Sequence, residues 1–436
     1  MDAAGVTDED VATTQIPEPI RHDTLNKPLR IGIDGRAFQS KLAGTGRYIL
    51  ELCRALDHWL PRAEFFIYSQ RPITLPAISE RWQIARDHSD LWGHLPATVW
   101  YIERGAALAQ RDGIDVFWGA ANFLPKGLGN QGNSAFGTNG GGRSRKATCK
   151  SILTVHDLVP QLYPQTMSFK HRLAYKLYFA RGLAAADRLV TNSQGTKQRL
   201  QQTFGRQADA VVYPCAGEPF QVPSQGHIER IKVRYGLKDT FLLAVATLEP
   251  RKNLGCLVDA LLALKSDGRV AVPELVLVGQ IGWKASDLLK QIEQARSRSI
   301  GVIQTGFVPN EDLPALYAGA KAFIFPSLYE GFGMPVLEAL TCGARVLASD
   351  IPEIREAGGS SVTYMEPSTQ GITQALRSLL APPPLTGEDT EEHADSFAKT
   401  HRSISVDQTT PLPAVHHAST WHEEGRKLAT LMASLS

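Results

Sequence analysis

The sequence has few cysteines and no long apolar segment. Five cysteines occur among 436 residues, and no two of them have Cys-x-x-Cys spacing. This odd count excludes a disulfide framework or a zinc motif as the organising feature and favours a reducing compartment. No window of about 18 apolar residues is present, which predicts no transmembrane helix. The first residues are acidic and lack the apolar core of a secretory signal, so we expect a cytoplasmic protein.

The sequence also lacks a large excess of either charge. It contains 46 lysines and arginines against 44 aspartates and glutamates, a formal net charge of +2. Because nucleic-acid-binding proteins usually carry a basic excess, this balance argues against such a partner. The balance is an average, however: the segments 1–27 and 388–395 are acidic, whereas 126–150 has five bases and no acids. The rest of the chain outside the two acidic segments is therefore basic, which is compatible with binding to an anionic membrane surface or a diphosphate-linked substrate.

Strand-like and helix-like segments alternate along most of the chain, which predicts parallel βαβ units. Strand-like runs occur at 29–34, 64–69, 97–102, 115–119, 151–157, 188–193, 241–247, 274–280, 301–307, 321–327, 345–349 and 361–366. We therefore expect an α/β protein with two doubly wound, Rossmann-like domains. Ligands of such sheets bind beyond the carboxyl ends of the strands, so the cleft between the domains is the expected site.

The expected domain boundaries follow from composition. The predicted organisation is a disordered acidic tail at 1–27, an N-terminal domain at 28–220, a C-terminal domain at 237–410 and a final helix within 415–436 that packs back on the N-terminal domain. The Gly/Asn/Ser-rich stretch 126–150 is too long for an ordered loop in a compact domain. We interpret it as a mobile surface insertion.

The stretch PSLYEGFGMPVLEALTCG, at 326–343, carries the clearest chemical signal. Glu330 ends a strand-to-helix connection, Gly331, Phe332 and Gly333 form a tight turn, and Glu338 lies one turn inside the next helix. The helix N-terminus suits a phosphate, whereas the two carboxylates suit hydrogen bonds from sugar or ribose hydroxyls. A solvated pair of glutamates at a helix start is the alternative, and the Gly-Phe-Gly turn argues against it.

With this Glu-x7-Glu pattern, the sequence resembles the retaining family 4 glycosyltransferases of the GT-B fold. The resemblance extends over nearly the whole chain through the blocks IGIDGRAFQSKLAGTGRYILEL, LTVHDLVPQLYP, AADRLVTNSQGTKQRL, VATLEPRKNL, LVLVGQIGW and TGFVPNEDLPALYAGAKAFIFPSLYEGFG. The GTLEPRKN-like and TVHDL-like blocks are similar to those of bacterial mannosyltransferases of polysaccharide and O-antigen assembly. The resemblance implies a GT-B fold with a nucleotide-sugar donor site in the C-terminal domain.

Arg251 and Lys252 follow a strand and precede a helix that Asn253 could cap. Two adjacent cations at the cleft suit a diphosphate leaving group, because they stabilise the charge that grows as the glycosidic bond breaks. In the family, the arginine often lies six residues before the lysine, and that position here is Ala246. Either Arg251 takes the role or Lys252 acts nearly alone.

Further site residues are implied by the resemblance. Catalytic roles fall to Glu330, His156, Arg251 and Lys252, and donor binding to Glu338, Gly331, Phe332, Gly333, Met334, Gly46, Gly279 and Thr247. Gly46 belongs to a Gly-x-Gly loop, which taken alone is usually just a turn, and Gly279 lets the backbone approach the nucleotide. His156 would contact the transferred sugar, by donating from its imidazole or by steadying positive charge through its backbone carbonyl.

The implied mechanism retains the anomeric configuration without an enzyme nucleophile. A paired-carboxylate glycosidase needs two acids beside the anomeric carbon, whereas the acids here are assigned to hydroxyl contacts. The resemblance implies a front-face displacement in which the leaving phosphate helps to deprotonate the acceptor. Asp8-Glu9-Asp10, the nearest match to an Asp-x-Asp metal motif, lies in the acidic tail. We therefore expect no metal ion and no cofactor.

The acceptor side is expected in the N-terminal domain. Residues 161–186 contain the bases Lys170, Arg172, Lys176 and Arg181, no acids, and the aromatic residues Phe169, Tyr175, Tyr178 and Phe179. A basic amphipathic helix with aromatic residues can lie on an anionic membrane surface. An ordinary helix whose aromatic residues face the core is the alternative.

We therefore interpret the chain as a hexosyltransferase with GDP-mannose as the first-choice donor. Its acceptor would be a saccharide or a polyprenyl-diphosphate-linked saccharide, reached at the cytoplasmic face of the inner membrane by peripheral contact, with no nucleic acid as partner. The alternatives are UDP-glucose or another hexose donor, an NDP-sugar epimerase on the same scaffold, and a nucleotide-sugar-binding module that has lost activity.

Overall fold

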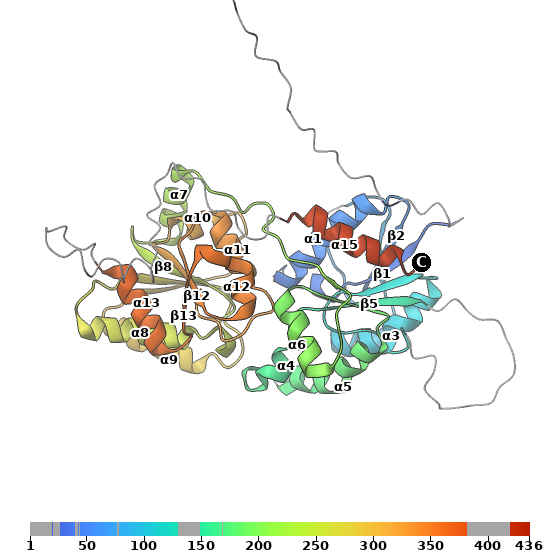
Figure 1. Ribbon diagram of the computed structural model, residues 1–436, viewed down its shortest axis with the longest axis horizontal. Helices are drawn as coiled ribbons and strands as arrows, with labels where there is room; N and C mark the ends of the chain where they lie inside the picture. The colour runs from blue at the N-terminus through green and yellow to red at the C-terminus, as the bar shows by residue number, and fades with distance from the viewer. Residues whose placement is uncertain are drawn as a thin grey trace, which may run out of the picture.

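The computed structural model describes residues 20, 27–39, 42, 44–75, 78–129, 149–167, 169–381 and 419–436. The expected tail at 1–27, the insertion at 126–150 and the acidic segment 388–395 fall almost entirely outside these residues. Two domains lie side by side, each built around a parallel sheet (Figure 1). None of the helices in the described ranges is both long and apolar enough to cross a membrane.

The N-terminal domain contains, within the described ranges, a seven-stranded sheet in the order β3-β2-β1-β4-β5-β6-β7. Its strands are β1 (Arg30–Asp34), β2 (Glu64–Ser69), β3 (Trp82–Arg86), β4 (Val116–Gly119), β5 (Lys150–Val155), β6 (Arg188–Thr191) and β7 (Ala210–Val211). Its longer helices are α1 (Gly44–Trp59), α3 (Ala97–Arg111), α5 (Phe169–Ala185) and α6 (Gln194–Phe204). Every strand pair is parallel, so the carboxyl ends of all strands meet at one edge.

The C-terminal domain contains a six-stranded sheet in the order β10-β9-β8-β11-β12-β13, again among described residues. The strands are β8 (Phe241–Val245), β9 (Glu274–Val278), β10 (Val302–Gly306), β11 (Ala322–Phe325), β12 (Val346–Ser349) and β13 (Val362–Met365). The helices are α7 (Gln225–Tyr235), α8 (Leu254–Asp267), α9 (Ser286–Ser297), α10 (Leu313–Gly319), α11 (Met334–Thr341), α12 (Pro352–Gly358) and α13 (Thr369–Leu380). The near-continuous burial of β8 and β9 fits a sheet covered by helices on both faces.

Helix α7 belongs to the C-terminal domain, although it precedes the expected boundary at residue 237. Arg234 and Tyr235, at its end, both donate to Asp312, with Nη1–Oδ1 and Oη–Oδ2 distances of 3.0 and 2.7 Å. These bonds fix α7 beside α10. The C-terminal domain therefore begins near residue 225.

The last helix, α15 (Trp421–Ala433), returns to the N-terminal domain and lies along α1 (Figure 1). Leu428 and Met432 are buried in the N-terminal core. Gly425 lies so close to Ala55 that a Cβ atom would overlap the alanine side chain. The chain thus crosses twice between the domains, and the second crossing ends in a packed helix.

Three local features differ from what the sequence predicts. The run 97–102 was expected as a strand, but it forms the start of α3, because its buried residues continue at helical spacing through Gly105 and Leu108. Edge strand β3 was not expected, since its half-exposed sequence WQIAR shows no clear apolar pattern. The Gly44–Gly46 segment, expected as a loop, forms the first turn of α1.

Candidate active site

A cavity of about 760 Å³ lies between the two domains and is lined by both. Every residue that the sequence assigned to catalysis or donor binding lines it: Gly46, His156, Thr247, Arg251, Lys252, Gly279, Glu330, Gly331, Phe332, Gly333, Met334 and Glu338. They come together because His156 follows β5, Thr247 follows β8, and Gly279 follows β9. Parallel strands present these loops at one edge, so the positions converge although the sequence separates them widely.

Glu330 forms the centre of an ion-pair cluster. Its Oε1 atom lies 2.6 Å from Lys252 Nζ, and its Oε2 atom lies 3.0 Å from Arg251 Nη1. Burial alone would raise the pKa of Glu330, but the charges of Arg251 and Lys252 outweigh it and lower that pKa to about 2. The carboxylate is therefore ionised and holds both cations at the cavity wall.

A second carboxylate balances the two cations. Arg251 also donates to Glu249, with an Nη2–Oε1 distance of 2.7 Å, and to the backbone carbonyl of Tyr329. Burial, together with repulsion from Arg251, lowers the pKa of Lys252. A phosphate that reaches this cluster adds negative charge and favours the protonated amine.

Asn253 does not cap the following helix with its side chain, contrary to expectation. It has a positive φ of 56° at the N-cap position of α8 and makes no side-chain cap bond. Instead its amide donates to the carbonyls of Pro326 and Pro367, at 3.1 and 2.8 Å. The first bond ties the Arg251–Lys252 turn to the end of β11, and the second ties it to the segment after β13.

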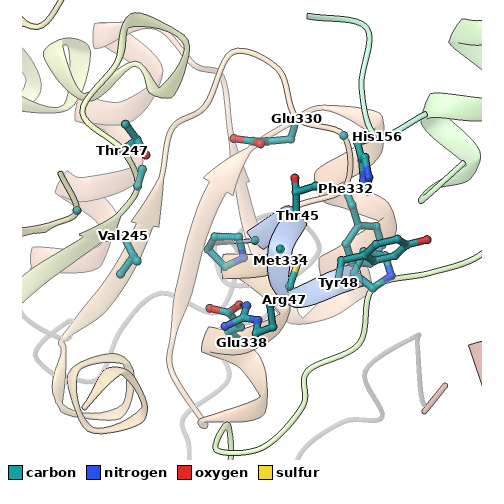
Figure 2. A pocket seen from close by; sticks show the side chains of 18 of the residues that line it. Thr45, Arg47, Tyr48, His156, Val245, Thr247, Glu330, Phe332, Met334 and Glu338 are labelled. Atoms are coloured by element: carbon teal, nitrogen blue, oxygen red, sulfur yellow. The ribbon is translucent and has the colours of Figure 1, made fainter. Parts of the chain in front are cut away.

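Glu338 is paired across the cleft with Arg47 of α1, a residue that the sequence analysis did not select. Figure 2 shows the two side chains turned toward each other, with Glu330 at the far end of the pocket. Glu338 is only 4% exposed and also accepts a hydrogen bond from the hydroxyl of Tyr317. Protein donors therefore bind both of its oxygens, and a sugar or ribose hydroxyl would use a remaining lone pair.

His156 is held as a neutral ring. Burial lowers its pKa, although the carbonyl of Ala120 and the charge of Asp157 oppose that shift. Its Nε2 atom lies 2.7 Å from the carbonyl oxygen of Ala120, so Nε2 carries the proton and donates there. The unprotonated Nδ1 can accept a hydrogen bond from a hydroxyl, so the neutral ring does not donate to the sugar as one of the two predicted roles requires. The other predicted role, through the backbone carbonyl, stays a prediction.

The two domains touch directly at Gly331. A Cβ atom on Gly331 would overlap the backbone carbonyl oxygen of His156. The carbonyl of Gly331 accepts hydrogen bonds from Ser193 Oγ at 2.6 Å and Thr196 Oγ1 at 3.1 Å. Gly279, at a φ of 138°, likewise leaves no room for a Cβ beside the carbonyl of Ala246. Glycine is therefore required at both positions by close backbone approach.

Sequence reasoning missed three polar residues of the site: Arg47, Tyr317 and Asn192. Arg47 directly follows the Gly-Thr-Gly segment, a signal that could have drawn attention to it. Asn192 follows β6 as His156 follows β5, and Tyr317 carries no local signal at all. In the part of the chain that the structure describes, no three His, Cys, Asp or Glu side chains are grouped as metal ligands.

The chain is similar in sequence to known glycosyltransferases. Residues 227–399 match the family of glycosyl transferases group 1. The chain is 29% identical over 348 residues to O-antigen chain mannosyltransferase B of Escherichia coli, a match that covers 75% of this chain and 84% of that protein. It is 32% identical over 241 residues to the serotype-specific mannosyltransferase WbdA of Escherichia coli, a match that covers 53% of this chain but only 29% of WbdA.

Solved structures with the same architecture show the fold. WaaG, a glycosyltransferase involved in lipopolysaccharide biosynthesis, superimposes with a TM-score of 0.60 at 16% identity, covering 92% of this chain and 95% of WaaG. Anabaena HepE in complex with UDP and glucose gives a TM-score of 0.55 at 14% identity, covering 93% and 97%. The chain therefore has the two-domain GT-B fold of these structures. The match of residues 227–399 to the group 1 glycosyl transferases and the similarity to O-antigen mannosyltransferases support a hexosyltransferase.

Proposed function

We propose that the protein transfers mannose from GDP-mannose, with retention of configuration, to a saccharide or lipid-linked saccharide during O-antigen-type polysaccharide assembly. The observation that carries the proposal is the cluster of Arg251, Lys252 and Glu330 at the inter-domain cavity. Its two cations can bind the diphosphate of a nucleotide sugar and stabilise it as the leaving group. The names of the relatives favour mannose, since both are mannosyltransferases.

The arrangement of carboxylates supports a front-face displacement. Among the described residues, the carboxylates that line the cavity are Asp157, Glu249, Glu330 and Glu338. Glu249, Glu330 and Glu338 are ion-paired, and Asp157 accepts a hydrogen bond from the backbone of Val159. Each of the four thus accepts at least one hydrogen bond or ion pair from the protein. The acceptor oxygen attacks the anomeric carbon as the bond to phosphate breaks, and the acceptor proton passes to the leaving phosphate oxygen.

A screen of donors tests this function. GDP-mannose, UDP-glucose, UDP-GlcNAc and dTDP-rhamnose are each incubated with the protein, and the release of nucleoside diphosphate and the thermal midpoint are measured. We expect GDP release and the largest thermal shift with GDP-mannose. Release of UDP from UDP-glucose alone would replace the proposed donor with the alternative one, and release from none of the four would refute the function.

We also propose that catalysis needs no metal ion. Arg251 and Lys252 supply at the cavity wall the positive charge that Mg²⁺ supplies in other transferases. The test compares turnover before and after treatment with excess EDTA. Unchanged turnover is expected, and a loss that Mg²⁺ or Mn²⁺ restores would refute metal independence.

The outer face of α5 supports a peripheral membrane contact at an anionic surface. Phe169, Leu173 and Leu177 recur every fourth residue and are 76%, 44% and 55% exposed. Arg172 and Lys176 are exposed on the same stretch. Of the aromatic residues expected to face the membrane, Phe179 is buried in the core, and Tyr175 is half-buried and accepts a hydrogen bond from Asn122. Tyr175 and Phe179 therefore follow the alternative in which aromatic residues face the core, and the face that we propose for the membrane is formed by Phe169, Leu173 and Leu177.

Flotation with vesicles tests the membrane contact. At low salt we expect the protein to float with phosphatidylglycerol vesicles and the Leu173→Glu, Leu177→Glu double variant to remain in solution. Val233→Glu is the matched control, because Val233 is an 81% exposed apolar residue on the other domain. If the wild-type protein stays in the soluble fraction, the membrane contact is refuted.

A further inference from the structure

Asn192 is a buried polar residue in the cavity that the proposed mechanism does not use. It follows β6 in the N-terminal domain, is 7% exposed and lines the cavity wall. Its Oδ1 atom is buried, and among the described residues it has no hydrogen-bond partner. Leaving a buried amide oxygen unpaired costs free energy, so native proteins rarely do so without a functional reason.

The backbone around Asn192 is firmly held. Ser193, the next residue, caps α6 by accepting from the backbone of Thr196 at 2.9 Å, and its hydroxyl donates to Gly331 across the domain interface. The first two amides of α6 donate to the carboxylate of Glu356 in the C-terminal domain, at 2.6 and 3.0 Å. Asn192 is therefore presented at a fixed position, and a ligand oxygen that reaches it meets a preorganised acceptor.

The position of Asn192 indicates which substrate it meets. Its amide nitrogen lies beside Gly331, where the backbone of the C-terminal domain touches the carbonyl of His156. The donor cations Arg251 and Lys252 belong to the C-terminal domain, whereas Asn192 and His156 belong to the N-terminal domain. Asn192 therefore lines the N-terminal side of the cavity, opposite the cations expected to bind the donor diphosphate.

We propose that Asn192 is an acceptor-binding residue whose Oδ1 accepts a hydrogen bond from a hydroxyl of the acceptor saccharide. This inference rests on the proposed transferase function and names a contact of its acceptor subsite. In the transfer, the acceptor oxygen forms the new bond to the anomeric carbon, the anomeric bond to phosphate breaks, and the proton leaves with the phosphate. The amide of Asn192 takes up no proton during this reaction. Asn192 therefore binds a hydroxyl next to the attacking one and fixes the orientation of the acceptor ring.

Two near-isosteric variants distinguish the effect of the Asn192 side-chain oxygen from the effect of the side-chain volume. Asn192→Leu removes the acceptor atom, whereas Asn192→Asp keeps an acceptor oxygen at the same place. The assay uses the nucleotide sugar that releases diphosphate in the donor screen, with a panel of fluorescent α-mannobiosides as acceptors. Transfer is measured against acceptor concentration, and hydrolysis of the donor by water is measured without acceptor. Thermal unfolding reports on folding.

For Asn192→Leu we expect the KM for the mannobioside to rise at least about tenfold, which corresponds to ~1.4 kcal/mol. Donor KM and donor hydrolysis stay within about twofold, and Asn192→Asp keeps an acceptor KM near that of the wild type. An unchanged acceptor KM in Asn192→Leu would overturn the proposal. So would equal losses in both variants, or a change confined to the donor, which would place the oxygen at the transferred sugar. Failure of the proposed function is distinct, because the wild type would then release no diphosphate.

Discussion

Arg47 and Glu338 form an ion pair that joins the two domains across the cleft. Arg47 lies in the first turn of α1, and Glu338 lies in α11, so the pair connects elements 291 residues apart in sequence (Figure 2). The side chains are 15% and 5% exposed. Because breaking such a pair leaves a charge in a poorly solvated place, the pair favours a closed cleft.

A double-mutant cycle measures this pair. Arg47→Met and Glu338→Gln should each lower the free energy of unfolding by about 1–3 kcal/mol, since each leaves a poorly solvated charge without its partner. The double variant should lose at least ~1 kcal/mol less than the sum, as measured by denaturant unfolding. Arg54→Met is the control, because its pair with Glu51 is exposed on the same helix. Strictly additive losses would show that the pair contributes nothing.

Glu330→Gln should reduce transfer by about 100-fold or more while the fold remains intact. The carboxylate holds Arg251 and Lys252 in place, and loss of one preorganised electrostatic contact typically costs this much in rate. Turnover and the thermal midpoint are compared with those of Glu293→Gln, which removes the same charge from an exposed site on α9. Wild-type turnover in Glu330→Gln would show that Glu330 is not part of the active site.

Gly331→Ala tests the direct contact between the domains. The new methyl group would overlap the carbonyl of His156, so we expect the cleft to open and transfer to fall at least about tenfold. Gly44→Ala is the matched control: Gly44 lines the same cavity, but the nearest atom to an added Cβ is Met334 Sδ at 3.8 Å. Equal activity in both alanine variants would contradict the close approach.

Much of the fold was predictable because parallel strands in the C-terminal domain are short apolar runs bounded by turn residues. The run 241–247, for instance, corresponds to β8. The run 97–102 misled the prediction, since its aromatic and β-branched residues favour strands over a short window while burial of Trp100 and Tyr101 suits a helix as well. Edge strand β3 depends on pairing with β2, a long-range contact that its own sequence does not encode.

The candidate site likewise contains residues that the sequence predicts and residues that only the tertiary structure reveals. Gly331 and Glu330 are recognisable because their turn and spacing are local. Arg47 and Tyr317 become partners of Glu338 only after the domains come together, and Asn192 becomes unusual only because its oxygen is buried without a partner. Spacing along the sequence therefore indicates which loops reach the cleft, whereas the partners of each charge follow from the tertiary structure.

The lowered pKa of His156 should make the free energy of unfolding depend on pH. Its folded-state pKa lies below the ordinary value of 6.5, so below that pH the unfolded chain binds a proton that the folded protein does not. The free energy of unfolding should therefore fall as the pH drops from 7.5 to 5, by at most ~1.4 kcal/mol per pH unit from this group. His156→Gln, which keeps a donor for Ala120, should show a shallower slope in thermal unfolding. Parallel profiles for wild type and variant would contradict a buried neutral ring.

The most direct test of the central claim follows a transfer reaction by proton NMR. The protein is mixed with GDP-mannose and an α-mannobioside, and the anomeric signals of donor and product are recorded with time. We predict loss of the donor signal and growth of an α-linked mannosyl product, since front-face displacement retains configuration. A β-linked product, or intact donor and acceptor under conditions where the protein is folded, would contradict the account.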